Sequence, residues 1–336
     1  MYRLSPFKGK TTLMFIIIDN NSHLLSFLLT LLQCICHISK GGLITFDSYR
    51  KNEVLTMEKV LKIEKDSVQE TLMLPLYGKV MAMQMWPTEF HDEDCLRFKE
   101  MIDYDFSAMQ EKMTGLYGKI AALSTAYRQF ALAVEIKNYL KDHPKAVIVL
   151  MGCGLDTVGH QADNGQCTFV NVDFPNVIET REKLLPSTGR EKNVACDLND
   201  YRWFEEVGFE RENGAVFIAS GVFMYFKKTE VAALFKAMGE RFPGAAVSFD
   251  AQNAKGAAMD LKALKDSGID ISLNFSLEAS TAEKTLREMC PSIDKVKIKG
   301  MVYPYKDPKP FGIIFRLMAK YSDKGMGMID TFTFQK

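Results

Sequence analysis

Two glycines that follow an apolar run are the residues of this sequence best placed to bind a ligand. Residues 147–151 read Val-Ile-Val-Leu-Met, which is typical of a strand buried on both faces, and the chain continues as Gly152-Cys-Gly154. The first glycine allows a sharp turn, and the second lets a ligand approach the backbone because it has no Cβ. A dinucleotide fingerprint would have a third glycine, but Thr157 stands there, which weakens the case for a bound pyrophosphate.

Two aspartates close the strands expected after this turn. Asp173 ends the next apolar segment, nineteen residues after Gly154, and Asp197 precedes Leu198 at the end of the one that follows. At the carboxyl edge of a parallel sheet, the first acid can accept both hydroxyls of a ribose, and the Asp–Leu pair can hold an adenine. The sequence therefore predicts an adenosine pocket without a phosphate cradle, and S-adenosylmethionine is the common ligand of that shape. In the alternative, both acids merely cap the following helices.

Alternating strands and helices must position these residues. Strands are predicted at 147–151, 168–173, 193–198, 215–219 and 245–250, with helices between them at 177–185, 201–207 and 229–241. This order indicates βαβ units, so we predict an α/β fold of Rossmann-like, doubly wound type with a mostly parallel seven-stranded sheet. An amphipathic helix is expected at 120–140, before the first strand. Later strands are expected near 271–275, at 295–303 and at 331–334, the last of them at an edge of the sheet.

Segments outside the alternation are expected to cover the pocket. Residues 60–145 form a predicted helical cover before the sheet core at 146–336, and residues 255–290 form a lid insertion after the fifth strand. Ligands of open α/β sheets bind outside the carboxyl ends of the strands, where long insertions collect. We therefore expect both segments to exclude water from the site, within one catalytic domain that spans residues 57–336.

The composition is that of an ordinary globular protein. Of the 336 residues, 47% are hydrophobic and 25% are charged, which excludes wholesale disorder. Lys and Arg total 42, as do Asp and Glu, and the zero net charge argues against a nucleic-acid coat protein or a broad binder of anionic membranes, so we expect no nucleic-acid partner and no membrane partner. The seven cysteines include no Cys-x-x-Cys pair, and Cys34-x-Cys36-His37 has no evident second ligand pair, so we expect no metal. A cytoplasmic monomer or homodimer is expected.

The first 56 residues differ from the rest. A basic start is followed by apolar runs at 13–18 and 24–38, which polar residues separate. The longer run has about fifteen residues, fewer than the roughly twenty that span a bilayer. Three interpretations are open: a membrane-proximal anchor, a short helix packed on the body, or an extension upstream of a natural start at Met57. We favour the last, which places residues 1–56 outside the catalytic fold.

Five blocks of the sequence together carry a family pattern. They are Val68-Gln-Glu-Thr-Leu72 with Leu76-Tyr77, Met101-Ile-Asp-Tyr-Asp-Phe106, Gly152-Cys-Gly-Leu-Asp-Thr157, Val172-Asp-Phe-Pro-Asn-Val-Ile178 and Ala219-Ser-Gly-Val-Phe-Met-Tyr225. With Arg128 in the helix before the sheet, they resemble the leucine carboxyl methyltransferase family, especially its bacterial branch of polyketide-type O-methyltransferases. The resemblance runs from about Val60 to the C-terminus. It implies a class I methyltransferase that depends on S-adenosylmethionine.

The resemblance also implies roles for individual residues. Those implied for the cofactor are Arg128, Gly152, Gly154, Asp173, Phe174, Asp197, Leu198 and Ser220. Arg128 would pair with the methionine carboxylate, Asp173 would hold the ribose, and Asp197 with Leu198 would hold the adenine. Tyr225 would face the methyl-transfer centre, so Tyr225 and Arg128 are the candidate catalytic residues. Gln69, Thr71 and Tyr77 would lie in the cover over a small-molecule substrate.

Some positions depart from the family pattern. Ser220 stands where the family commonly has Glu, which puts one polar contact to the cofactor in doubt. Val158 and Gln161 stand where the family commonly has arginines, and His160 is unusual at its place. We expect these changes to affect the choice of substrate more than the binding of the cofactor.

Methyl transfer from a sulfonium is an in-line displacement, for which alignment of the nucleophile can supply roughly 7–11 kcal/mol of the barrier. A carboxylate acceptor is already ionised and needs no base, whereas a phenol, with a pKa of about 10, would want one. His91 and His160 are the plausible bases, and neither has an evident orienting partner in the sequence. We therefore favour carboxyl methylation slightly over phenol methylation.

Two alternative functions are considered. A nicotinamide-dependent oxidoreductase could use the same glycine turn, but the third glycine and a Tyr-x-x-x-Lys pair near a strand end are missing. A non-catalytic protein that binds S-adenosylmethionine in the same fold would be consistent with Ser220.

Overall fold

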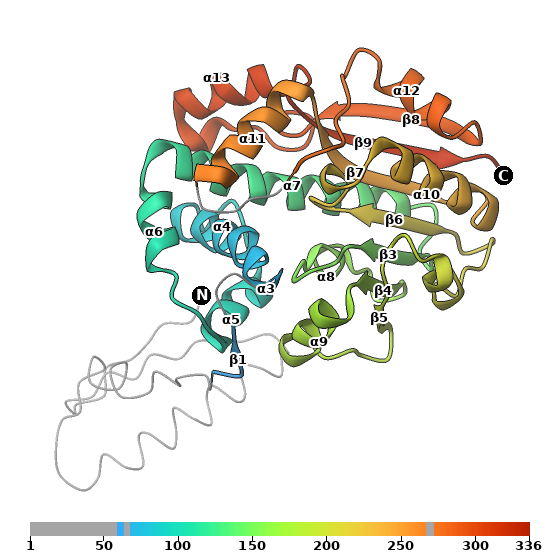
Figure 1. Cartoon of the computed structure of the whole chain (residues 1–336), viewed down its shortest axis with the longest axis horizontal. Coiled ribbons are helices and arrows are strands. Elements are labelled where there is room, and N and C mark those ends of the chain that lie inside the picture. Colours follow the sequence, from blue (N-terminus) through green and yellow to red (C-terminus); the bar gives the residue numbers. More distant parts are fainter. Residues whose placement is uncertain (1–58, 64–67, 267–271) are drawn as a thin grey trace, which may run out of the picture. The chain divides into compact units, whose positions relative to one another are not determined.

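The computed structural model describes residues 59–63, 68–266 and 272–336, with a seven-stranded sheet at the centre (Figure 1). The chain divides into two units, Met1–Thr56 and Met57–Lys336, and every described residue belongs to the second. The sheet is made of β3 (Val147–Met151), β4 (Thr168–Asp173), β5 (Glu191–Ala195), β6 (Ala215–Ala219), β7 (Ala246–Gln252), β8 (Ile293–Gly300) and β9 (Gly327–Phe334). Their order across the sheet is β5-β4-β3-β6-β7-β9-β8.

The first five of these strands run parallel. In the register of β3 with its neighbours, Val149 lies opposite Val170 of β4 and Phe217 of β6. Only β9 is reversed, and it pairs antiparallel with both β7 and β8. All residues of β3 and β6 are buried, because helices cover both faces of the sheet. These observations confirm the predicted α/β fold with a mostly parallel seven-stranded sheet.

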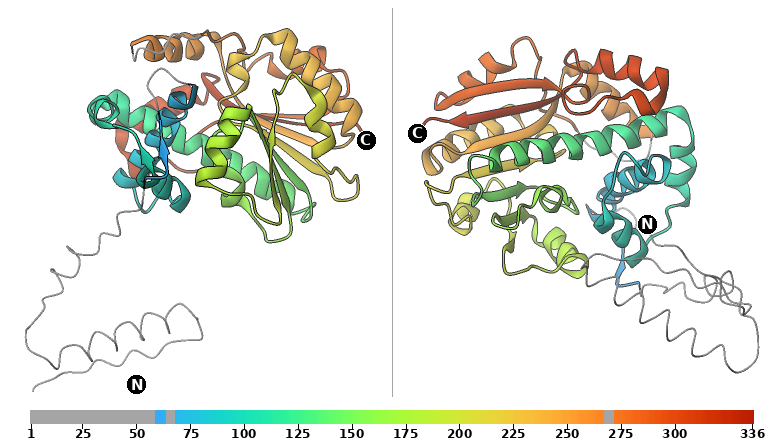
Figure 2. Two further views of the ribbon diagram at one scale, coloured as in Figure 1. Left: turned by 60° about the horizontal axis from the view of Figure 1, so that its bottom comes forward. Right: turned by 180° about the vertical axis from the view of Figure 1, so that it is seen from behind.

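One face of the sheet is covered by the long helix α7 (Leu116–Leu140), with α8 (Val158–Ala162) and α9 (Pro175–Leu184). The helix α7 runs along this face in the view from behind (Figure 2). Its Leu132 and Ile136 are buried in one cluster with Ile148 and Ile218 of the strands. This packing fixes the orientation of α7, and with it the position of every residue that α7 presents to the ends of the strands.

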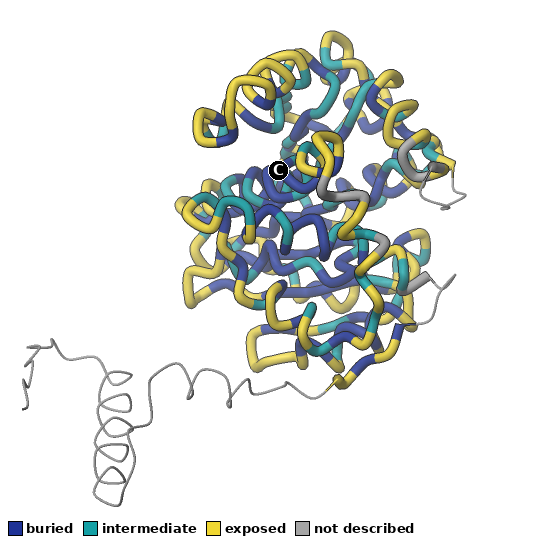
Figure 3. The backbone as a smooth tube through the Cα atoms, turned by 90° about the vertical axis from the view of Figure 1, so that its left-hand side faces the viewer, coloured by how far each residue is buried: buried dark blue, intermediate teal, exposed yellow. Residues whose placement is uncertain are grey.

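The opposite face is covered by the 3-10 helix η1 (Tyr201–Glu206), α10 (Lys228–Arg241) and α12 (Ala282–Met289). Aromatic rings fill this layer, and the rings of Phe235 and Phe332 lie 4.9 Å apart, edge to face. Such pairs add about 0.5–1.5 kcal/mol each to the gain from burial. Figure 3 shows buried backbone in the interior, with exposed turns around it.

A third cluster lies beside the sheet, and we call it the cover core. It is formed by α4 (Met73–Met85), α5 (Glu93–Met101), the first half of α7, and α13 (Gly312–Ser322). Met73, Phe98 and Tyr127 are fully buried in it, and Phe315 of α13 joins them. The short segments β1 (Leu61–Lys62), β2 (Ile102–Asp103), α3 (Val68–Thr71) and α6 (Ser107–Thr114) complete this part.

Several predicted elements need correction. The strand expected at 193–198 is β5, which ends at Ala195, so Asp197 lies in the following loop. The strand expected at an edge is β9, which lies between β7 and β8 because β8 pairs with its far side. Residues 272–275 form no strand, and residue 271 lies outside the described residues. Helix α12, which falls within the predicted lid, buries Leu286 in the core of the sheet.

A buried carboxyl group in β9 makes the stability of this sheet depend on pH. Asp330 lies opposite Phe249 of β7, is fully buried, and neither of its oxygens has a hydrogen-bond partner among the described residues. Burial, with a smaller effect from the charge of Asp250, raises the pKa of Asp330 to about 7. The folded protein therefore keeps a proton that the unfolded chain loses near pH 4, so stability falls as the pH rises from about 4 to 7.

We expect Asp330→Asn to remove this loss. At pH 8 the free energy of unfolding of the variant should exceed that of the parent by about 1–3 kcal/mol, so the variant should unfold at a higher urea concentration. The difference should vanish near pH 4. Urea unfolding at the two pH values measures this. Asp294→Asn, at an exposed position of β8, is the matched control and should leave the pH dependence unchanged. An equal difference between parent and Asp330→Asn at both pH values would contradict the explanation.

Candidate active site

The glycine turn lies at the carboxyl end of β3, where both of its glycines need a backbone conformation that other residues avoid. Gly152 has φ 62° and Gly154 has φ 46°. A Cβ at position 152 would lie 2.7 Å from Cγ2 of Val222, and one at position 154 would lie 3.1 Å from Cδ2 of Leu72. The turn is therefore tightly enclosed by the loop after β6 on one side and by the cover on the other.

Gly152→Ala should destabilise the protein by about 2–4 kcal/mol, because the positive φ and the contact with Val222 both act against a methyl group. Gly165 has φ 79°, and a methyl group added there would meet nothing within 4 Å, so Gly165→Ala isolates the backbone effect. That control should cost only about 1–2 kcal/mol. Urea unfolding compares the two variants, and equal losses would show that the contact with Val222 relaxes.

Asp173, at the end of β4, faces the glycine turn. Its Oδ2 accepts the backbone N–H of Gly154 at 2.7 Å, and its Oδ1 accepts the N–H of Phe174 at 2.7 Å. Burial raises the pKa of Asp173, although these hydrogen bonds and Arg181 act against the shift. A carboxylate has about four acceptor positions, so the two backbone bonds leave capacity for two hydroxyl donors. The structure thus brings together the acid and the glycines that the sequence singled out.

The residues predicted to hold an adenine lie in the loop after β5. Asp197 is exposed, and its Oδ1 accepts the N–H of Asn199 at 2.9 Å. Leu198 is buried, and its carbonyl accepts the indole N–H of Trp203 at 3.2 Å. Phe174 follows β4 and is 49% exposed. Both strand ends belong to the same edge of the sheet, since Asp173 pairs with Ala195 in the register of β4 and β5.

Arg128 reaches the end of the sheet from α7 and meets a partner that the sequence did not reveal. Its Nη1 lies 3.4 Å from Oδ2 of Asp250 in β7, and the backbone N–H of Gly221 donates to Oδ1 of Asp250 at 2.5 Å. Burial alone would lower the pKa of Arg128, but the Asp250 and Asp156 carboxylates outweigh it and raise that pKa. Arg128 is therefore a cation fixed beside the loop after β6.

Two other predicted residues border this loop. Tyr225 belongs to the 3-10 helix η2 (Phe223–Tyr225) and is 47% exposed. Desolvation raises the pKa of the Tyr225 hydroxyl, whereas the charge of Arg128 lowers it. Ser220 follows β6 directly and is half-buried. Arg128, Ser220 and Tyr225 thus lie around the end of β6, and their roles toward the cofactor and the substrate stay predictions.

The predicted substrate residues lie in different settings. Thr71 is exposed at the end of α3, whereas Tyr77 of α4 is buried and its ring stacks on Phe106 at 5.1 Å. Burial raises the pKa of the Tyr77 hydroxyl. The side chain of Gln69 lies outside the described residues. Tyr77 is packed inside the cover core, so a role for it in substrate contact stays a prediction.

A buried polar network joins the cover to the glycine turn. Asp92 caps the N-terminus of α5, accepting the N–H of Cys95 at 3.0 Å, and it also accepts hydrogen bonds from Thr157, Gln129 and Gln161. Gln161 donates to Asp92 at 3.0 Å, which explains how this chain uses a position where the family commonly has arginine. The network therefore ties α5 and α7 to the segment that follows Gly154.

Lys79 is a functional candidate that the sequence analysis did not single out. It is buried in α4, and its Nζ lies 3.8 Å from Oδ1 of Asp156 in the glycine turn. Burial alone would lower the pKa of Lys79, but Asp156, Cys95 and Asp92 outweigh it, so that pKa is raised. The signal in the sequence was a single lysine within an apolar helix, which is also typical of a side chain that reaches solvent.

His160 has partners that the sequence did not show. Its Nδ1 lies 3.1 Å from Oδ2 of Asp94, and its Nε2 lies 3.0 Å from Oε2 of Glu191. Both ring nitrogens face carboxylates, an arrangement that favours the protonated ring, in which both nitrogens donate. The hydrogen bond to Glu191 is the largest cause that raises the pKa of His160, and Asp94 adds to it. A ring engaged at both nitrogens has no free nitrogen to accept a proton from a substrate.

We expect His160→Gln to destabilise the protein most below pH 6.5. The pKa of His160 in the folded protein lies above its unfolded value of about 6.5. The ion pairs therefore stabilise the protein fully below about pH 6.5, and this stability is lost as the pH rises through the folded pKa. The expected loss is about 1 kcal/mol, because the ring is partly exposed and screened. Urea unfolding at pH 5.5 and 8.5 measures it, with His91→Gln, at an exposed site, as the control. A loss that is larger at pH 8.5 would contradict the assignment.

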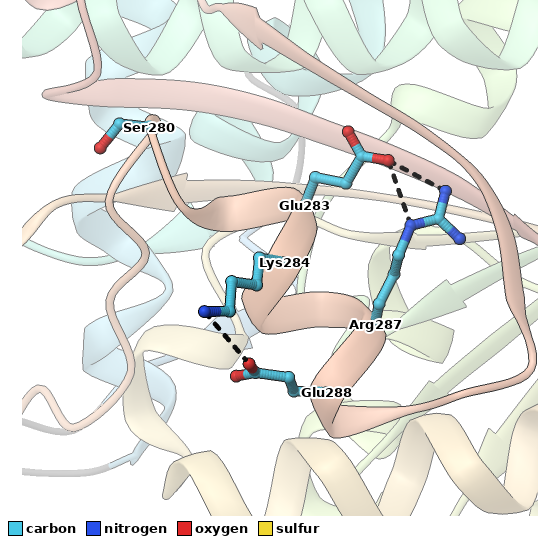
Figure 4. A pocket seen from close by; sticks show the side chains of 5 residues that line it. All are labelled: Ser280, Glu283, Lys284, Arg287 and Glu288. Carbon is cyan, nitrogen blue, oxygen red and sulfur yellow. Dashed lines mark hydrogen bonds and ion pairs between the residues drawn. The ribbon is translucent and has the colours of Figure 1, made fainter.

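Two other kinds of site, a metal site and a surface pocket, were considered among the described residues. No group of three or more His, Cys, Asp or Glu within the described ranges could hold a metal, and Cys34, Cys36 and His37 lie outside them. A surface hollow on α12 is lined by Ser280, Glu283, Lys284, Arg287 and Glu288. Its charged side chains pair with one another along the helix (Figure 4), so they are satisfied without a ligand.

Comparison with known proteins decides the family. The sequence profile of the leucine carboxyl methyltransferases matches residues 64–239. The chain belongs to the leucine carboxyl methyltransferase family. It is 25% identical over 190 residues to the tetracenomycin polyketide synthesis O-methyltransferase TcmP of Streptomyces glaucescens, which covers 56% of this chain and 67% of that protein.

The fold is also shared with a solved structure. A duf574 family protein from Streptomyces avermitilis is similar with a TM-score of 0.52 at 13% identity, over 70% of this chain and 92% of that one. Membership of the leucine carboxyl methyltransferase family confirms the predicted enzyme class, a methyltransferase that depends on S-adenosylmethionine. It also decides against the nicotinamide-dependent oxidoreductase.

Proposed function

We propose that this leucine carboxyl methyltransferase family member transfers a methyl group from S-adenosylmethionine to an oxygen atom of a small-molecule acceptor. One observation carries the proposal: the Asp173 carboxylate and the Gly154 N–H are hydrogen-bonded at the edge of the sheet where β3 and β4 end. This contact sets an acceptor for ribose hydroxyls next to a turn without side chains. The name of the tetracenomycin relative supports a small-molecule acceptor.

The residues at this edge suit the different parts of the cofactor. We assign the ribose to Asp173, with Phe174 beside it, and the adenine to Asp197 and Leu198. The methionine end carries both an ammonium and a carboxylate, and the cations Arg128 and Lys79 alternate here with the acids Asp250 and Asp156. Opposite charges within about 4–6 Å favour the ionised forms of both partners. The set therefore fits a zwitterion, with Gly152 and Gly154 at its backbone side.

When bound, the cofactor supplies a methyl group on a positively charged sulfur. The acceptor oxygen forms the new C–O bond as the C–S bond breaks, so the chain has to align the oxygen and keep water away. Tyr225 and Arg128 border the end of β6 and are the proposed positioning groups at the transfer centre. His160 is held at both ring nitrogens and supplies no base. A carboxylate acceptor needs none, which favours it over a phenol.

Helix α11 (Ala254–Asp266) is the proposed lid. It begins two residues after the end of β7, and it carries the exposed Asp260, whose pKa is raised by desolvation of its carboxyl group and affected by a hydrogen bond with Gln252 and by the charges of Arg128 and Asp250. This places one carboxyl of α11 within the electrostatic reach of the site. The other helix of the expected lid, α12, belongs to the core, so the proposed lid is limited to the segment around α11.

We propose a cytoplasmic location, which the free thiols of the described cysteines support, since disulfides are rare in the cytosol. Within the described ranges, no helix is both long and apolar enough to cross a bilayer. Sedimentation analysis distinguishes the two expected states of assembly, a monomer and a homodimer.

Calorimetry and labelling test the proposed function together. S-adenosylhomocysteine should bind and nicotinamide dinucleotide should not. Incubation with methyl-tritiated S-adenosylmethionine in a lysate, followed by size separation, should label small molecules at acid- or base-labile positions if the acceptor is a carboxylate. Binding without any labelled product would favour the non-catalytic alternative, for which Ser220 in place of the family's Glu is the supporting feature. Absence of binding would overturn the proposal.

A further inference from the structure

Helix α13 presents a continuous apolar face to solvent. Ile313 is 71% exposed and Leu317 is 64% exposed, and Ile314, Met318 and Tyr321 are also exposed. At 3.6 residues per turn these five positions share one side of the helix. Phe315 and Ala319, on the other side, are buried in the cover core and hold the helix in place. Large apolar side chains gathered on a surface mark a site of interaction.

Cations line one edge of this face. Arg316, Lys320 and Lys324 are exposed and follow one another at four-residue spacing. From the neighbouring helix α11, Lys255 places its Nζ 2.9 Å from the hydroxyl of Tyr321. Lys255, and to a smaller extent Lys324, lower the pKa of Tyr321.

Asp323, the acid that directly follows the helix, is engaged by backbone groups. Asp323 is half-buried and its carboxylate accepts the backbone N–H groups of Val302 at 2.9 Å and Tyr303 at 2.7 Å. The helix itself, residues 312–322, contains no acidic residue. The apolar face, with Arg316, Lys320 and Lys324 along one edge and Lys255 of α11 against Tyr321, is named the α13 surface.

We propose that the α13 surface docks the protein on an anionic lipid membrane. Helices with an apolar face bordered by Lys and Arg lie in the interface of bilayers, where their cations meet anionic headgroups. The zero net charge of the whole chain argues against broad membrane binding, but these four cations act locally, within a Debye length of about 8 Å. The proposal does not depend on the proposed function.

A second copy of the chain fits this surface less well. In an antiparallel two-fold pairing of α13 with itself, the same edge of each helix faces its equivalent, so basic edge would meet basic edge. The helix offers no acid to compensate the repulsion. An anionic membrane supplies both the apolar phase and the opposite charge.

Vesicle sedimentation of the full chain tests the proposal. The protein should bind vesicles of phosphatidylcholine with one-third phosphatidylserine, bind phosphatidylcholine alone far less, and dissociate as salt is raised. Arg316→Glu/Lys320→Glu should weaken binding at least about 25-fold, at about fivefold for each cation lost. Ile313→Ser/Leu317→Ser should weaken it similarly. The controls Lys236→Glu on α10 and Leu96→Ser on α5, both at exposed positions, should bind like the parent.

Hydrogen exchange of the peptide 312–324 gives a local readout that does not rely on the variants. Anionic vesicles should slow exchange there, whereas neutral vesicles should not. Unchanged exchange, or equal vesicle binding by Arg316→Glu/Lys320→Glu, would overturn the proposal even if residues 1–56 carried the protein to vesicles. A dimer in sedimentation analysis that Ile313→Ser/Leu317→Ser dissociates, without vesicle binding, would instead assign the surface to a second copy.

Discussion

Asp173→Asn is expected to weaken the binding of S-adenosylhomocysteine about 100-fold or more, because two charge-assisted hydrogen bonds to ribose hydroxyls, at about 1.5–3 kcal/mol each, are lost or weakened. An amide in this position also turns a donor toward the N–H of Gly154 or Phe174, which both point at the carboxylate. Isothermal calorimetry measures the affinity, and circular dichroism checks that the variant folds.

Glu179→Gln is the matched control for this change, since Glu179 is an exposed carboxylate on the neighbouring helix α9. It should bind the ligand like the parent. If Asp173→Asn binds within threefold of the parent, the ribose lies elsewhere and the proposed function loses its main support. Asp197→Asn should have a smaller effect, about tenfold, because a single hydrogen bond accepted by an exposed acid is worth about 1–1.5 kcal/mol.

Asp92→Ala should lower the free energy of unfolding by about 3–5 kcal/mol, the loss typical of removing one partner from a buried charged network. Asp92 accepts from Thr157, Gln129 and Gln161 at once, and these donors, the first two buried and the third half-buried, would lose their acceptor. Burial alone would raise the pKa of Asp92, but Lys79 and the hydrogen bonds lower it, so the group is ionised in the folded protein. Its removal also leaves Lys79 with less compensating charge.

Urea unfolding measures this loss, and Glu93→Ala is the control. Glu93 is the next residue in the first turn of α5, and its side chain is exposed, so its removal should change stability by less than about 0.5 kcal/mol. Since Thr157 directly follows the glycine turn, we also expect Asp92→Ala to weaken cofactor binding. A loss of stability under about 1 kcal/mol would show that water replaces the carboxylate and that the network does not hold the turn.

The strands that build the site could be predicted because they are buried on both faces. The bounds of β3, β4 and β6 follow from apolar runs that turn residues interrupt, and these strands place Gly152, Gly154 and Asp173 together. The strand β5 begins and ends earlier than predicted because it lies at an edge of the sheet and starts with the polar residues Glu191, Lys192 and Asn193. Edge strands commonly carry such residues, which hide the apolar signal.

The contacts between distant segments could not be predicted. The sequence indicates no partner for Arg128, but Asp250 lies 122 residues later and comes from a strand whose neighbours the sequence does not reveal. The network around Asp92 joins three segments, and no local pattern relates Asp92 to Gln129 or Thr157. His160 has no orienting partner evident in the sequence, and the structure gives it two. Such pairings depend on how helices cross the sheet, which periodicity does not encode.

The position of β9 inside the sheet has a consequence for the protein during its synthesis. The segments of β3, β4, β5 and β6 leave the ribosome early. Each of them can pair with a strand that has already been made, since their order in the sheet is β5-β4-β3-β6. The segment of β8 is made before β9 but has no place in the sheet until β9 lies between it and β7. For that interval, β7 has one unpaired side, which exposes the nascent chain to association with others. A slow or stalled ribosome between the segments of β8 and β9 would prolong this vulnerable state.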